Sequence, residues 1–181
     1  MTPTATPPTG PSSGSATPAT VLFGDFEQEF ASTRRMLERF PDGKRDWRPH
    51  EKSRTLGELA THVADLPNRG TTVLETDEMT VGERPPLAPL GSATELVAFF
   101  DANAARARAA VGAADFASLE RPWTIHRGAQ VLATQPKRIM LRTLMMSHLV
   151  HHRAQLGVYY RLLGVPVPGV YGPSADEGPR L

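Results

Sequence analysis

The clearest pattern in the chain is a set of apolar residues spaced three or four positions apart after residue 20, which is the spacing of one helix face. The pattern ends at Pro41-Asp42-Gly43, a sequence typical of a turn. It predicts a first amphipathic helix. The apolar face of this helix consists of Leu22, Phe26, Phe30, Thr33, Leu37 and Phe40.

Capping motifs predict the starts of two further helices. In Thr55-x-x-Glu58 and Ser92-x-x-Glu95 a hydroxyl residue precedes a glutamate by three positions, which is the spacing of a capping box. Apolar residues follow each motif at helical spacing, and the later of these two helices is expected to extend to about residue 112.

Proline residues interrupt this part of the chain. Pro67 removes the backbone bond to the Val63 carbonyl, so the helix that begins near residue 55 is predicted to kink or end there. Residues 81–90 contain Pro85, Pro86 and Pro89 and are predicted to form a loop.

The last helix is predicted to be the longest. Pro136 fits its first position, where a missing amide hydrogen costs nothing. Gly164 and Pro166 are expected to end it. One stripe along this helix contains Leu141, Leu144, Met145, His148, His152, Leu156, Tyr159 and Leu163.

Four amphipathic helices with little strand signal predict an all-α four-helix bundle. A short β-hairpin is predicted before the last helix, because residues 122–126 have weak strand character and Gly128 can turn the chain back towards Val131 and Leu132. The 181 residues, 40% of them hydrophobic, suffice for one compact domain. Residues 1–20, rich in Thr, Pro and Ser, are expected to form a flexible tail, and residues 21–181 the helical domain.

Composition narrows the classes of partner. The formal net charge of +1 provides no basic excess for nucleic acid. The chain has no cysteine, so any thiol chemistry must use a thiol that the substrate brings. The first residues lack a basic start and an apolar stretch, so we expect neither a secretory signal nor a membrane anchor. These features favour a cytoplasmic protein that binds a small molecule and neither nucleic acid nor membrane.

Three histidines carry the chemistry that the sequence suggests. His148 and His152 are four residues apart, so a helix places both imidazoles on one face. His62, on a separate predicted helix, is the candidate third ligand, and three imidazoles would leave a coordination position open, as in catalytic zinc sites. The alternative is that these are ordinary buried histidines hydrogen-bonded to backbone or carboxylate groups.

Four polar residues are candidates to support this site or contact a substrate. Glu58 and Asp65 flank His62 and could accept its second N–H, or both could face solvent. Gln155 falls in line with the two later histidines and could hold a metal-bound water, a substrate oxygen or another helix. His151 lies at the edge of the stripe, where it could contact a substrate or belong to the surface.

A family resemblance rests on four segments. Residues 148–159 (HLVHHRAQLGVY) followed by 162–168 (LLGVPVP) resemble the closing helix of the DinB family, also called DinB/YfiT-like metalloenzymes. Residues 56–63 (LGELATHV) resemble its second-helix motif, and residues 170–174 (VYGPS) its closing segment. The resemblance spans about residues 21–175.

The resemblance implies a metal site formed by His62, His148 and His152, an up-down-down-up helical bundle and a homodimer. It also implies a bound divalent ion, zinc or nickel first, with iron, copper and manganese as further options. The family name refers to induction by DNA damage and does not imply a polymerase.

Relatives in this family act as transferases or isomerases that use a low-molecular-weight thiol such as glutathione, mycothiol or bacillithiol. The resemblance therefore favours a thiol-dependent S-transferase of stress response or detoxification. One alternative is a metal-dependent hydrolase, in which Asp65 could act as the general base. The other is a non-catalytic metal-binding stress protein or scaffold. We also expect Arg153 to point away from the site and pair with a surface carboxylate.

Overall fold

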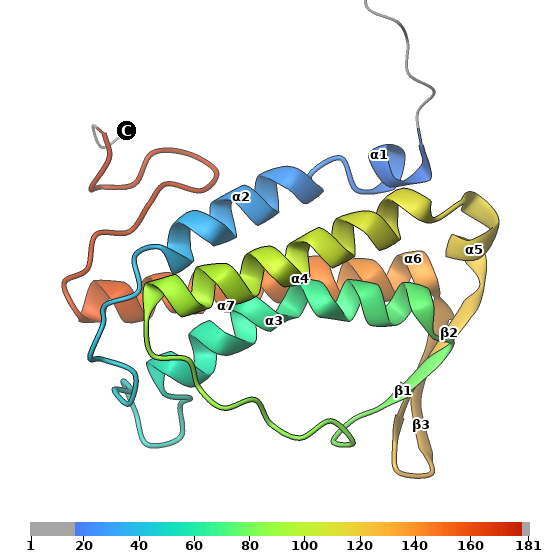
Figure 1. The fold of residues 1–181 in the computed structure, drawn as a ribbon, viewed down its shortest axis with the longest axis horizontal. Helices are drawn as coiled ribbons and strands as arrows, with labels where there is room; N and C mark the ends of the chain where they lie inside the picture. The colour runs from blue at the N-terminus through green and yellow to red at the C-terminus, as the bar shows by residue number, and fades with distance from the viewer. Residues whose placement is uncertain (1–16, 179–181) are drawn as a thin grey trace, which may run out of the picture.

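The computed structural model describes residues 17–178, which are mostly helical with a small three-stranded sheet towards one end (Figure 1). The first sixteen residues of the expected tail lie outside this range, and a short helix crosses the expected boundary at residue 20. In chain order the elements are α1 (Pro18–Leu22), α2 (Phe26–Leu37), α3 (Leu56–Glu75), β1 (Glu78–Thr80), α4 (Ala93–Ala113), α5 (Phe116–Glu120), β2 (Pro122–Arg127), β3 (Gln130–Pro136), α6 (Lys137–Met140), the π-helical segment η1 (Leu141–Ser147) and α7 (His148–Leu162).

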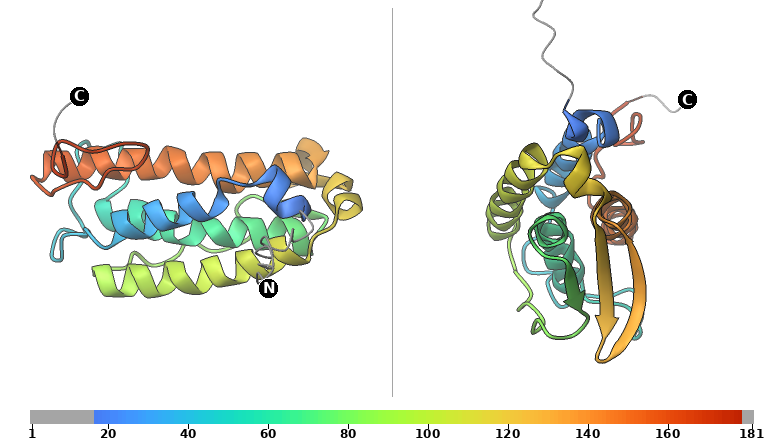
Figure 2. Two further views of the ribbon diagram at one scale, coloured as in Figure 1. Left: turned by 90° about the horizontal axis from the view of Figure 1, so that it is seen from above. Right: turned by 90° about the vertical axis from the view of Figure 1, so that its right-hand side faces the viewer.

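Four long helical segments make up the body of the molecule: α2, α3, α4 and the continuous run α6-η1-α7. Seen end on, these segments surround a common centre (Figure 2). In Figure 1, α3 and α4 run in the same direction and α2 and α7 run in the opposite one. The chain between β1 and α4, which we call the crossover segment (residues 81–92), makes that parallel arrangement of α3 and α4 possible.

Each long helix contributes large side chains to one buried core. Phe30 and Leu37 come from α2, Leu59 and Leu66 from α3, Leu96 and Phe100 from α4, and Leu149, Leu156 and Tyr160 from α7. Within residues 17–178, no helix is long and apolar enough to cross a membrane.

Most of the predicted helices are present. The apolar face predicted for the first helix is buried from Phe26 to Phe40, although the helix is interrupted after Leu22. Both capping boxes form as the spacing predicted: the hydroxyls of Thr55 and Ser92 each accept a hydrogen bond from the backbone N–H of the glutamate three residues later.

α3 continues from Leu56 to Glu75 with Pro67 inside it, so the predicted alternative that the helix ends at Pro67 is wrong. A proline removes one backbone hydrogen bond from a helix. Residues on both sides of Pro67, including Leu66 and Val73, are buried against other elements, and this tertiary packing outweighs the lost bond.

The predicted hairpin is confirmed by β2 and β3, which pair in antiparallel fashion with Gly128 at positive φ in the turn. The sequence did not reveal β1, which pairs with β2 in parallel fashion, since three residues are too few to show an alternation. Next to the sheet, the buried Lys137 donates hydrogen bonds to the carbonyls of Leu74 and Thr76. The end of α3 is thereby fastened to the start of the last helical run.

A π-helical segment changes the register of the last helix. Beyond η1, Leu156 of the predicted stripe is buried as expected, but the other buried positions are Leu149, Arg153 and Tyr160 rather than His148, His152 and Tyr159. A π-helical turn contains more residues than an α-helical turn, which changes the register of the helix beyond it. The two histidines therefore lie beside the core stripe rather than within it.

Gly70 marks a close contact between α3 and η1. A Cβ atom at this position would lie 2.3 Å from Sδ of Met145, so the Met145 side chain occupies the space beside Gly70, one turn before the histidines of α7 begin.

Arg153 is buried, so its predicted position on the surface is wrong. The shifted register turns it towards α2, where its guanidinium lies 2.6 Å from Oε2 of Glu29 and donates to the Thr33 hydroxyl. Both members of this ion pair are almost fully buried. The Tyr171 hydroxyl donates to Oε1 of Glu29, so the segment after α7 closes over the pair.

Replacing Glu29 by Gln should lower the free energy of unfolding by about 3–5 kcal/mol, because a buried guanidinium loses its counter-charge. The matched control is Glu27→Gln on the same helix, which breaks an exposed pair with Arg108 and should cost about 1 kcal/mol or less. Urea denaturation measures both values. Equal, small losses for the two variants would contradict the anchoring role of Glu29.

Candidate metal centre

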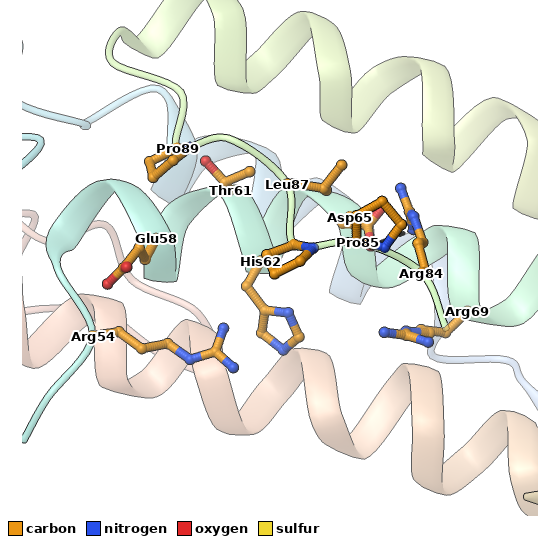
Figure 3. Close-up of a pocket in the computed structure, with 11 residues that line it drawn as sticks. Arg54, Glu58, Thr61, His62, Asp65, Arg69, Arg84, Pro85, Leu87 and Pro89 are labelled. Carbon is orange, nitrogen blue, oxygen red and sulfur yellow. Dashed lines mark hydrogen bonds and ion pairs between the residues drawn. The ribbon is translucent and has the colours of Figure 1, made fainter. Parts of the chain in front are cut away.

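A cavity of about 520 Å³ lies between α3 and the crossover segment (Figure 3). Its α3 wall includes Glu58, His62, Asp65 and Arg69, and the crossover segment supplies prolines and Arg84. Cavities of about 300–1,000 Å³ are typical of small-molecule sites.

The capping box of α3 sets the position of His62. Thr55 fixes the first turn, and His62 follows about two turns later on the side of α3 that faces α7. Because α3 is continuous beyond this point, the imidazole is held by a regular helix and not by a loop.

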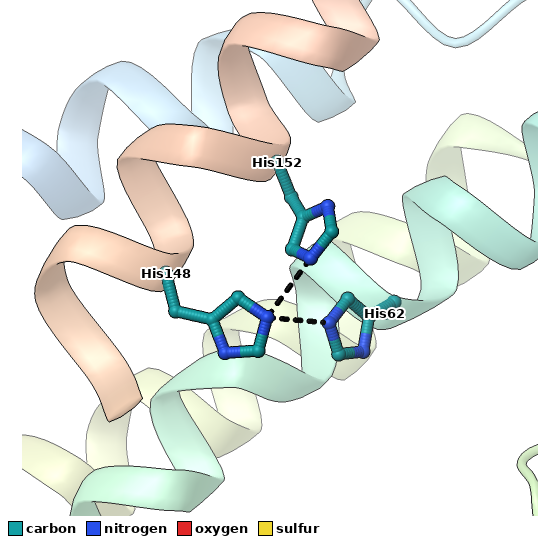
Figure 4. Close-up of side chains that lie close together, drawn as sticks. All are labelled: His62, His148 and His152. Carbon is teal, nitrogen blue, oxygen red and sulfur yellow. Dashed lines mark hydrogen bonds between the residues drawn. The ribbon is translucent and has the colours of Figure 1, made fainter. Parts of the chain in front are cut away.

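His148 and His152 project from the first turns of α7 towards His62 (Figure 4). Their four-residue spacing falls within regular α-helix, so the pair keeps the geometry that the sequence predicted. The π-helical segment η1 directly precedes the pair. Segments of this kind occur frequently at functional sites.

The Nε2 atoms of the three histidines converge. Nε2 of His148 lies 3.3 Å from Nε2 of His62 and 2.9 Å from Nε2 of His152. One nitrogen from each ring can be chosen so that all three lie within 4.8 Å of one another, and all three side chains are partly buried. The structure therefore brings together the three residues that the sequence singled out, as a group that could hold a metal ion.

The two Nε2–Nε2 separations that involve His148 fit one shared cation. Ligand distances of about 2.0–2.1 Å and angles of about 90–110° place neighbouring nitrogens about 2.8–3.4 Å apart. The observed 3.3 Å and 2.9 Å lie within this interval. Three ligands from two helices leave room for at least one further ligand.

Hydrogen bonds at the outer nitrogens favour lone pairs at the converging ones. Oε1 of Gln155 lies 2.7 Å from Nδ1 of His152, and because an amide oxygen can only accept, Nδ1 carries the proton. The ring of His148 is bonded to the backbone of Leu144. With protons on these outer positions, Nε2 of both rings is free to bind a cation.

The surroundings also favour the neutral imidazoles that metals require. Burial, helped by the positive charge of Arg54, lowers the pKa of His62 to about 3. Burial and the nearby His152 lower the pKa of His148 to about 4. Burial likewise lowers the pKa of His152, while its bond to Gln155 acts in the opposite direction.

The other candidate residues have different partners. Glu58 accepts the backbone N–H of Thr55 and so completes the capping box. Asp65 is buried and pairs with Arg84 at 2.9 Å. Neither carboxylate is hydrogen-bonded to His62 in the described part of the chain. The exposed His151 contacts the ring of His152, with 4.8 Å between ring centroids.

The arginines of this site were not predicted from the sequence. Arg54, Arg69 and Arg84 all line the cavity. One signal for Arg69 was available, because seven residues separate it from His62 and two helical turns return a side chain to the same face. Arg84 lies in the predicted loop, and nothing in its local sequence shows that it reaches Asp65.

Comparisons with known proteins agree on one family. The model of the DinB family matches residues 15–180. A DinB-like protein from Bacillus cereus is 25% identical, and the superposition covers 83% of this chain and 95% of that one with a TM-score of 0.62. The DinB-like protein YjoA from Bacillus subtilis is 18% identical, over 81% and 96% of the two chains, with a TM-score of 0.59. No curated protein matches.

The stability of the metal-free protein should decrease as the pH falls from 7 towards 4. In the folded state the pKa values of His62 and His148 are about 3 and 4, below their ordinary value of 6.5. Below pH 6.5 the unfolded chain therefore binds protons that the folded chain does not, which favours unfolding.

Urea denaturation of the chelator-treated protein at several pH values measures this effect. The double variant His62→Gln, His148→Gln serves as the control and should show a shallower decrease. If both proteins lose stability with the same slope, other groups cause the pH dependence.

Proposed function

The chain belongs to the DinB family, and from that premise we propose that it is a metal-dependent enzyme in which His62, His148 and His152 hold one divalent cation. The convergence of three Nε2 atoms at the edge of a cavity is the observation that carries the proposal. Zinc or nickel is the preferred ion, since neutral imidazoles suit both.

The reaction that we propose is transfer of a low-molecular-weight thiol to an electrophile, in stress response or detoxification. The bound cation would supply a Lewis acid that favours the thiolate form of the thiol at neutral pH. The histidines hold the cation, Gln155 orients one of them, and the cavity beside His62 admits the substrate.

The positions of the carboxylates favour thiol transfer over hydrolysis. Hydrolysis needs a general base near the metal-bound water. Asp65 is paired with Arg84 and Glu58 is bonded to the backbone of Thr55, so neither is poised for that role. A thiol, with an ordinary pKa near 8.5, loses its proton to solvent more readily than water does.

The proposal includes the finer features of the fold and assembly. We interpret the four long helical segments as the up-down-down-up bundle that the family resemblance implies, with α3 and α4 as its parallel pair. The homodimer, the cytoplasmic location and the lack of nucleic-acid and membrane partners stay predictions.

Protein purified without an affinity tag should contain about one equivalent of divalent metal, because three converging imidazoles form a strong site. The double variant His62→Ala, His148→Ala should lose it. His50→Ala, at an exposed histidine outside the triad, should keep it. Elemental analysis gives the stoichiometry, and circular dichroism verifies the fold. Wild-type protein that takes up no metal even after reconstitution would refute the proposal.

The metal-loaded protein should consume a thiol together with 1-chloro-2,4-dinitrobenzene, and chelation or His148→Ala should abolish the reaction. Absorbance of the thioether product follows the transfer. Hydrolysis of 4-nitrophenyl acetate without thiol would instead indicate a hydrolase. A metal-loaded protein with neither activity would be a metal-binding scaffold.

A further inference from the structure

Two arginines extend towards His62 from opposite sides. Figure 3 shows the guanidinium groups of Arg54 and Arg69 on either side of the His62 ring, and both line the cavity. Arg54 immediately precedes the N-cap of α3, whereas Arg69 lies seven residues beyond His62 on α3 itself. The cavity therefore has a guanidinium group on each side of His62, the one histidine of the triad among its lining residues.

These two arginines lack an acidic partner. Among residues 17–178, neither guanidinium lies within ion-pair distance of a carboxylate. The polar contact recorded for Arg69 is a long one, 3.4 Å from Nη1 to Sδ of Met79. Arg84 differs, because it is paired with Asp65.

The cavity lining contains three arginines and two carboxylates, which leaves a net charge of +1. Asp65 is paired with Arg84, and Glu58 accepts the backbone N–H of Thr55. A bound divalent cation would add further positive charge between the arginines. An anionic ligand would therefore complement the positive charge of the cavity.

The guanidinium groups of Arg54 and Arg69 lie on opposite sides of the His62 ring (Figure 3). Seven residues of α3 correspond to about 10 Å along its axis, which shows the length scale of the site.

We propose that this cavity binds an elongated organic dianion, one acidic group on Arg54 and the other on Arg69, with a sulfur or oxygen atom between them facing His62. The assignment of this ligand as a substrate rests on the proposed function. Carboxylates are suitable acidic groups, because the planar guanidinium fork matches them with two parallel hydrogen bonds. A cavity of about 520 Å³ accommodates a molecule of this size.

The probe for this proposal is 3,3'-thiodipropionate, in which two carboxylates flank a thioether sulfur. Its dimethyl ester has the same backbone without the charges, and 3-(methylthio)propionate retains one carboxylate. Isothermal titration of the full chain, both zinc-loaded and metal-free, gives the dissociation constants and the stoichiometry. The metal-free titrations keep the test independent of the proposed enzymatic function.

The dianion should bind with 1:1 stoichiometry and at least about tenfold more tightly than the diester, a difference of about 1.4 kcal/mol. Arg54→Gln and Arg69→Gln should each weaken dianion binding by about tenfold, and the double variant should bind dianion and diester alike. Arg127→Gln, at an exposed arginine outside the cavity, should change nothing. Far-UV circular dichroism checks that each variant is folded.

Equal affinity for dianion and diester would overturn the proposal, as would an equal loss in Arg127→Gln. Binding of two monocarboxylates, each sensitive to one arginine, with no advantage for the dianion would also overturn it. Failure of the anion tests in a protein that holds metal and consumes thiol would refute this inference alone. Arginine-dependent dianion binding to a protein that takes up no metal would refute the proposed function and leave the anion site standing.

Discussion

The relative register of α3 and α7 decides whether three imidazoles can meet. A rotation of α7 by one residue, about 100°, would carry His148 and His152 away from His62. Several contacts prevent this rotation. Lys137 ties the start of the last helical run to the end of α3, and the buried pair of Arg153 with Glu29 holds α7 against α2.

The sequence predicts the spacing of the two histidines on α7 but not the rotation of α7 relative to α3. The four-residue spacing of His148 and His152 survives because both lie beyond the π-helical segment, in regular helix. The burial of Arg153 could not be predicted, since a stripe drawn at 100° per residue assumes a uniform helix. No local sequence pattern indicates η1, in which Met145 packs against Gly70 of α3.

Fold prediction failed where tertiary contacts outweigh local preferences. The capping boxes and the hairpin depend on neighbouring residues and were predictable, whereas the continuation of α3 through Pro67 depends on burial. The arginines of the cavity were not predicted for the same reason. Arg54 and Arg84 lie in segments without regular secondary structure, and only the tertiary fold brings them to the site. The histidines were recognisable because metal ligands need specific atoms at specific spacings, which arginines around an anion do not.

The crossover segment forms one wall of the cavity but contributes little to the core of the protein. Residues 81–89 are exposed, and the segment is fastened to α3 by the pair of Arg84 with Asp65 and by the bond from the Leu90 amide to the Thr61 hydroxyl. Three prolines restrict its backbone before any ligand arrives, so binding orders little chain. Because this wall contributes few buried side chains, its residues can change without loss of the core or the histidines. Mutation of the crossover segment can therefore reshape this wall of the cavity while the core and the histidines stay unchanged, an evolutionary freedom that the helices do not have.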